Sequence, residues 1–255
     1  MSTFPINCAL GALNEVLPNQ IVSGKQSRLF SSLKLSNKEL IATSTLFAVL
    51  RLVPELLAEL IRDTGIRLND RTVLDTYTEI GVTKSPHQKN DRPDGFIYIK
   101  NRNEWTALVE AKVGNNSLSL EQVTKYIEDA RANGIDAVVT ISNEFTPRVD
   151  QIPVSLTKRL LTKVKLYHLS WRLILSSAIL LKNNKQIEDR EKSFVLDELF
   201  RFLRDDSVGN KTFSQMPAAW KDVCNDAYIG AKLKNLILKY LKYPVHWSKS
   251  FPKLL

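Results

Sequence analysis

Three charged residues stand next to apolar runs that have the composition of buried β-strands. Asp94 comes just before one such run, and Glu110 and Lys112 follow another, Ala107-Leu108-Val109. Residues two apart on a strand point to the same face. Glu110 and Lys112 therefore share a face, whereas Ala111 points away from it into packing. Charges among core residues cost free energy unless they are paired or bind a partner, so this arrangement predicts a binding or catalytic site.

The chemistry expected of these side chains is metal-assisted attack on a phosphate ester. If the two apolar runs pair as a hairpin, Asp94 lies beside Glu110. Two converging carboxylates suit Mg²⁺ or Mn²⁺, and the main-chain carbonyl of Ala111 can add a third ligand. Lys112 would then orient an attacking water, help to deprotonate it, or stabilise negative charge on a phosphate.

The surrounding segments predict the elements that position this site. A capping box at Ser36-Asn37-Lys38-Glu39 predicts the start of a long helix, which Pro54 either kinks or divides in two and Gly65 ends. The helix predicted after the hairpin is followed by another apolar strand, which is the pattern of a parallel strand pair with a helical crossover. Strands are expected at residues 73–82, 96–100, 106–113, 136–143 and 162–169, and later helices at 119–133, 171–181, 192–203 and 219–240.

Pro93-Asp94, followed by Glu110-Ala111-Lys112 at the end of an apolar strand, resembles the motif of the PD-(D/E)xK nuclease superfamily. The resemblance covers residues 37–145. It implies an α/β protein with the restriction-endonuclease-like fold, an αβββαβ core whose mixed central sheet is flanked by helices. A helical C-terminal extension would follow this core. The implied roles are metal binding for Asp94 and Glu110 and orientation of the nucleophile for Lys112.

The same resemblance implies three further site residues. Many members carry an acidic residue on the helix before the first strand, and Glu55 fits that role best, with Glu59 in reserve. Some branches carry a Gln and a Tyr four apart on the helix after the lysine strand, here Gln122 and Tyr126, which hold the site or touch nucleic acid. Each has a structural alternative. Glu55 would favour a helix N-terminus, Gln122 would complete a capping box with Ser119, and Tyr126 would be half-buried core.

Structural roles also compete for the other polar residues. Asp94, Glu110 and Lys112 could form an exposed salt-bridge cluster, which would contribute little to stability. Glu79 is expected to point outward from its strand, and His87 to lie in a solvated loop. His168 and Trp171 bracket a strand-to-helix junction and are interpreted as structural.

Composition indicates a globular protein, with 44% hydrophobic and 25% charged residues among 255. The net charge of +9 indicates either an anionic partner or an ordinary lysine excess. Cys8 and Cys224 form neither a disulfide framework nor a zinc site. No signal peptide and no membrane-length apolar run is recognised, so a cytoplasmic protein without a membrane partner is expected.

The chain is predicted to comprise an N-terminal arm (1–36), a nuclease-like core (37–181) and a basic helical C-terminal extension (182–255). Residues 211–255 contain eight lysines against Asp222 and Asp226, together with aromatic residues such as Trp220. Such a segment suits nucleic acid, by charge and by stacking, or forms a solvated helix face over aromatic core residues.

The function predicted is Mg²⁺- or Mn²⁺-dependent hydrolysis of phosphodiester bonds, with DNA as the preferred substrate. Two alternatives remain open: a nucleic-acid-binding module of the same fold with little or no cleavage, and a protein-interaction domain with an incidental charge cluster. RNA as substrate, strandedness, the mode of cleavage and a homodimeric state also stay open.

Overall fold

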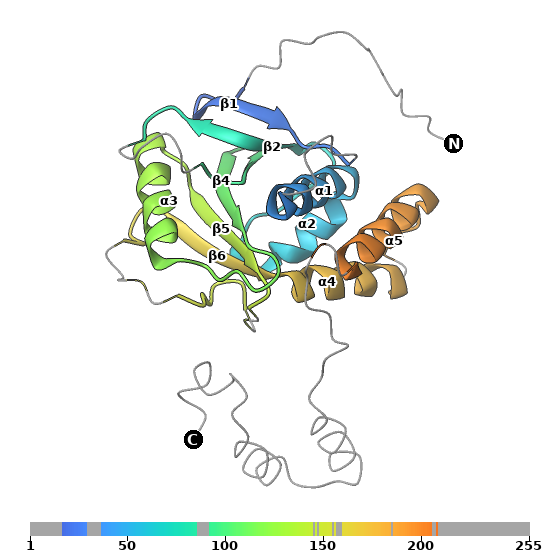
Figure 1. The fold of residues 1–255 in the computed structure, drawn as a ribbon. Coiled ribbons are helices and arrows are strands. Elements are labelled where there is room, and N and C mark those ends of the chain that lie inside the picture. The colour runs from blue at the N-terminus through green and yellow to red at the C-terminus, as the bar shows by residue number, and fades with distance from the viewer. Residues whose placement is uncertain are drawn as a thin grey trace, which may run out of the picture.

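The computed structural model describes residues 17–29, 37–85, 92–144, 146, 148–154, 156, 160–184, 186–205 and 208. They form a mixed α/β structure, a six-stranded sheet with helices on both faces (Figure 1). The strands are β1 (Ile21–Gln26), β2 (Val73–Val82), β3 (Gly95–Lys100), β4 (Glu104–Ala111), β5 (Ala137–Ser142) and β6 (Lys165–Ser170). The helices are α1 (Lys38–Leu52), α2 (Pro54–Leu60), the short 3₁₀ helix η1 (Arg62–Thr64), α3 (Leu120–Asn133), α4 (Trp171–Asn183) and α5 (Arg190–Arg204).

The order of strands in the sheet follows their order in the chain. Strands β1 to β4 are antiparallel, whereas β4, β5 and β6 run parallel. The predicted hairpin is confirmed as β3 and β4, with Gly95 paired to Val109 at one end and Lys100 to Glu104 at the other. The predicted parallel pair is confirmed as β4 and β5, which α3 connects.

Both faces of the sheet are buried, which explains why its central strands are apolar along most of their length. On one face, α3 packs Val123 and Ile127 against Leu108 and other side chains of the sheet. On the opposite face, α1, α2, α4 and α5 form the larger cluster, which includes Val109 (Figure 1). Consecutive residues of β4 thus point to opposite faces of the sheet, and this alternation decides whether a side chain faces α3 or the other helices.

Strand β1 was not predicted, since its residues were assigned to an N-terminal arm. It is an edge strand in which only Ile21 is buried, so it lacks a strong alternating pattern. The sheet consequently begins before residue 37. The core likewise continues beyond residue 181, because α5 buries Leu196, Leu199 and Leu203 in the larger cluster. The helix predicted at 219–240 and the lysine-rich segment 211–255 lie outside the described residues.

The structure identifies the residue that caps α1 and decides whether Pro54 kinks one helix or begins another. Asn37, not Ser36, caps α1, because its side chain accepts a hydrogen bond from the main-chain N–H of Leu40 at 3.1 Å. Pro54 does not kink a continuous helix but starts α2, since proline disfavours helical geometry at the preceding Val53. Within the described ranges, no single helix has the length and apolar character of a membrane span; α1 and α2 meet that test only together, bent by 107°.

Gly95 allows α1 to approach the first residue of β3. A Cβ placed on Gly95 would lie 2.6 Å from Cζ of Phe47, and 3.3 Å from Cγ2 of Thr43, both on α1. Phe47 is fully buried, so its ring has little room to move away. The absence of a side chain at residue 95 therefore sets how closely α1 packs beside Asp94.

We predict that Gly95→Ala lowers the free energy of unfolding by about 1–3 kcal/mol, the usual cost of overpacking a core. Urea unfolding followed by circular dichroism measures this change. The same substitution in a Phe47→Leu background should cost less, because the smaller side chain relieves the clash. Equal costs in the two backgrounds would exclude this clash as the cause.

Candidate active site

The charged cluster lies at the end of the sheet where β3 begins and β4 ends. Because Gly95 pairs with Val109, the next residues outward, Asp94 and Glu110, are neighbours across the hairpin. Oδ2 of Asp94 accepts a hydrogen bond from the main-chain N–H of Ala111 at 2.9 Å. The structure thus brings together the two predicted carboxylates, and it places the main chain of Ala111 directly beside Asp94.

Glu110 is the most unusual side chain of this cluster, because it is ionisable yet only 3% exposed. Its Oε1 accepts a hydrogen bond from Nζ of Lys112 at 2.7 Å. Its Oε2 is buried and, within the described part of the chain, has no hydrogen-bond partner. A buried oxygen in this state is costly, and among the described residues Oε2 of Glu55 is in the same state. Glu110 differs from Glu55 in having a second carboxylate, that of Asp94, beside it on the neighbouring strand.

Lys112 is held in place through its main chain. Its N–H donates to the carbonyl of Ile141 at 2.7 Å, and its carbonyl accepts from Nε1 of Trp171 at 2.9 Å. Trp171 is 2% exposed and begins α4, which confirms the structural role predicted for it. The side chain of Lys112 is 13% exposed, so its ammonium group lies within the cluster rather than free in solvent.

Glu39, in the first turn of α1, belongs to the cluster although the sequence pattern does not predict this. Its Oε2 lies 3.8 Å from Nζ of Lys112, and its Oε1 accepts a hydrogen bond from Nδ2 of Asn116 at 2.9 Å. The sequence pattern predicts Glu39 as the distal member of a capping box with Ser36. Asn37 is also a favourable N-cap residue. With Asn37 as the cap, Glu39 is no longer three residues after the cap, so it is not needed for a capping box.

The structure does not bring Glu55 to the cluster. Oε1 of Glu55 lies 2.6 Å from Nζ of Lys192 on α5. Glu59, the reserve candidate, pairs with Arg62 at 3.1 Å. Glu39 stands at the start of α1 and Glu55 beyond its end, a separation of about 22 Å along a 15-residue helix. The 107° bend before α2 then directs Glu55 towards α4 and α5.

The predicted pair on α3 faces the same layer as Glu110. Tyr126 is 2% exposed, and its hydroxyl donates to the carbonyl of Arg92 at 3.3 Å. Gln122 is half-buried one turn earlier on the same flank of the helix. The side chain of Ser119 makes no capping bond, so the alternative of a capping box with Gln122 gains no support from Ser119.

Two other polar residues have structural roles. His168 is fully buried; its Nδ1 lies 2.9 Å from Oγ1 of Thr140 and its Nε2 lies 2.9 Å from the carbonyl of Glu144. Burial lowers the pKa of His168 to about 4, so the ring is neutral at pH 7. Glu79 pairs with Lys25 of the edge strand β1 at 2.7 Å. His87 lies outside the described residues.

Burial and crowding of the carboxylates dominate the electrostatics of the site. Burial first, and then the neighbouring charge of Glu110, raises the pKa of Asp94 to about 8. Burial also raises the pKa of Glu110, against the opposing effect of Lys112. Burial would lower the pKa of Lys112, but its ion pair with Glu110 outweighs this and the pKa is raised. Two buried carboxylates this close ionise together only if a positive charge compensates them.

The donor chemistry of this site fits a hard divalent cation. Within the described ranges, no three side chains of the types His, Cys, Asp and Glu form a group that could hold a metal ion. The predicted set instead consists of Asp94, Glu110 and a main-chain carbonyl, all oxygen donors of the kind that Mg²⁺ and Mn²⁺ prefer. The unpartnered Oε2 of Glu110 is the atom that such an ion would satisfy.

Comparison with known proteins gives this chain no relatives: no protein-family model matches it, and no curated protein sequence matches it.

We predict that Asp94→Asn raises the free energy of unfolding at pH 8 and that this gain shrinks as the pH falls towards 4. The folded state keeps a proton on Asp94 up to about pH 8, whereas the unfolded chain releases it near 3.8. Wild-type stability is therefore lost as the pH rises between these values, by at most about 1.4 kcal/mol per pH unit. Asparagine avoids this loss and keeps an oxygen that can accept from Ala111. Urea unfolding at several pH values tests this, and a pH-independent difference would contradict it.

Proposed function

We propose that this protein is a metal-dependent nuclease of the PD-(D/E)xK superfamily that hydrolyses phosphodiester bonds, with DNA as its preferred substrate. The observation that carries the proposal is the convergence of Asp94, Glu110 and Lys112 at one buried spot, where Oε2 of Glu110 lacks a partner. The order of elements supports it. Helices α1 and α2 precede three antiparallel strands, β2 to β4, and α3 then leads to the parallel strand β5, in the αβββαβ order of the restriction-endonuclease-like core.

In this proposal Asp94 and Glu110 hold Mg²⁺ or Mn²⁺, with the carbonyl of Ala111 as a further ligand. When bound, the ion activates water and offsets negative charge that develops on the phosphate. Glu39 takes the role that Glu55 was expected to have, since it shares Lys112 with Glu110. Asn116 fixes the orientation of Glu39 by donating to its other oxygen.

Lys112 acts in this scheme as a hydrogen-bond donor. Its raised pKa keeps it protonated at neutral pH, so it does not take a proton from water while it is paired with Glu110. A protonated amine can orient the attacking water or stabilise the extra negative charge on the phosphate. Gln122 and Tyr126 would line the cleft on the α3 side, and the net charge of +9 favours a polyanionic substrate.

The ion pair between Lys112 and Glu110 also favours a second candidate function. The pair occupies one carboxylate oxygen of the proposed metal site. A protein that binds nucleic acid without cutting it has no need to break this ion pair. Binding without cleavage is therefore the competing function. Incubation of supercoiled plasmid with the protein, in Mg²⁺ or Mn²⁺ and with EDTA as control, distinguishes the two.

We predict that Asp94→Ala and Lys112→Ala each reduce DNA cleavage by at least about 100-fold, the usual cost of losing a charge-stabilising group at the reacting centre. Circular dichroism should show an intact fold in both variants. Full cleavage by either variant in Mg²⁺ would overturn the assignment of these residues. Gel analysis of plasmid nicking over time provides the measurement.

The two helix carboxylates provide a matched comparison. Glu39→Gln should reduce cleavage by about 10–100-fold, as expected when a residue that supports a metal site is lost. Glu55→Gln should leave cleavage unchanged, because Glu55 pairs with Lys192 instead. Calorimetric titration with Ca²⁺ adds a readout that does not require turnover, and it should show weaker binding for Glu39→Gln alone. The reverse pattern would restore Glu55 to the site.

A further inference from the structure

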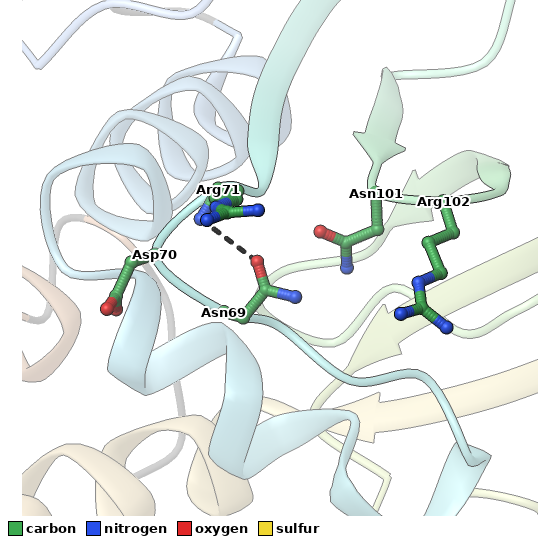
Figure 2. Close-up of a pocket in the computed structure, with 5 residues that line it drawn as sticks. All are labelled: Asn69, Asp70, Arg71, Asn101 and Arg102. Carbon is green, nitrogen blue, oxygen red and sulfur yellow. Dashed lines mark hydrogen bonds between the residues drawn. The ribbon is translucent and has the colours of Figure 1, made fainter.

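A second polar pocket lies at the opposite end of the β3–β4 hairpin from Asp94. It has a volume of about 480 Å³ and is lined by residues of two loops, Asn69, Asp70 and Arg71 before β2, and Asn101 and Arg102 in the hairpin turn (Figure 2). The six residues of β3 separate it from the carboxylate cluster by roughly 20 Å. A ligand in this pocket is therefore distinct from a phosphate held at Asp94.

Both loops are braced by hydrogen bonds, so the pocket is formed in advance of any ligand. The hydroxyl of Thr72 donates to Oδ1 of Asn101 at 2.6 Å, which ties the two loops together. Nδ2 of Asn101 donates to the carbonyl of Arg67 at 2.7 Å. The loop before β2 closes on itself, since the main-chain N–H of Asn69 donates to the same hydroxyl of Thr72 at 2.8 Å.

Four of the five lining side chains carry hydrogen-bond donors, and the fifth, Asp70, carries a carboxylate. Oδ1 of Asn69 accepts from the main-chain N–H of Arg71 at 2.9 Å, so its amide nitrogen turns towards Asn101 and Arg102 (Figure 2). Among the described residues, neither the guanidinium of Arg71 nor that of Arg102 forms an ion pair, in contrast to Arg62, Arg148 and Arg201. The carboxylate of Asp70 points away from Asn101 and Arg102 (Figure 2).

We propose that this pocket binds the phosphate group of a phosphate ester. Two guanidinium groups and a fixed amide N–H are donors that suit the several oxygens of a phosphate, and arginine presents them in a planar fork. The lining residues include no aromatic or aliphatic side chain against which a base could stack. Recognition therefore rests on the phosphate, which either a nucleic-acid backbone or a free nucleotide can supply. The proposal does not depend on nuclease activity.

Chemical modification of arginine tests this proposal in the full-length wild-type chain. Phenylglyoxal reacts with exposed guanidinium groups, and peptide mass spectrometry reports the rate at each arginine separately. Inorganic phosphate should slow the modification of Arg71 and Arg102 several-fold, relative to sodium chloride of equal ionic strength. Arg190 is exposed on α5 and serves as the control whose rate should not change. Equal effects at all three arginines would overturn the proposal.

The same protection experiment with two other ligands identifies the source of the phosphate. A DNA duplex in EDTA, which prevents cleavage, should protect Arg71 and Arg102 if a nucleic-acid backbone is the ligand. Adenosine monophosphate should protect them more strongly than the duplex if a free nucleotide is the ligand. Arg102→Gln provides a second check, because it should remove most of the protection of Arg71 by inorganic phosphate. Persistence of full protection in that variant would count against a site shared by the two arginines.

Discussion

Burying a carboxylate costs free energy unless positive charge or hydrogen-bond donors stabilise it, and among the described residues Glu110 has such a partner at only one of its two oxygens. Lys112 pairs with one oxygen, while the other is buried without a partner in the described structure. Asp94 adds a second carboxylate beside the first, and Glu39 adds a third acidic group on the far side of Lys112. One lysine therefore faces three acidic residues. Burial is the first cause of the raised pKa values of Asp94 and Glu110, and for Asp94 the neighbouring charge of Glu110 adds to it. Perturbed carboxyl groups of this kind make the cluster a candidate functional site.

The scaffold keeps this costly arrangement in one geometry by drawing on several elements. Trp171 of α4 and Ile141 of β5 hold the main chain of Lys112, so the lysine is positioned even though β4 has already ended. Tyr126 of α3 donates to the carbonyl of Arg92, two residues before Asp94. Gly95 lets Phe47 reach the sheet, which brings α1 close to Asp94. Each support comes from a regular element, and sites built on such elements are held more rigidly than sites on loops.

The β3–β4 hairpin has a cluster of ionisable groups at each end. Asp94 and Glu110 place two carboxyl groups at one end, and Arg71 and Arg102 place two guanidinium groups around the turn at the other. The first region is the proposed site for a cation and the phosphate that it would hold, and the second is the proposed site for a phosphate bound directly. The length of β3 separates the two proposed sites, so each proposal can be tested independently of the other.

Local sequence was sufficient to identify much of the fold and the centre of the site. The strand period and the expected pairing of the two apolar runs as a hairpin place Asp94 beside Glu110, because the alternation of side chains restricts the register of paired strands. The pattern of strand, helix and strand likewise predicted the parallel pair β4 and β5. Edge strand β1 could not be predicted, because an exposed edge imposes little periodicity on its residues.

The third acidic residue was decided by the tertiary structure. Glu39 and Glu55 both stand in the first turn of a helix, and nothing in the local sequence distinguishes them. The choice depends on where each helix starts relative to the sheet, and it is set by the Asn37 cap, by the 107° bend at Pro54 and by the close packing of Phe47 on Gly95. The sequence by itself determined which residues could do the chemistry within one hairpin. Only long-range packing decided which distant carboxylate joins them, because that contact connects residues far apart in the chain.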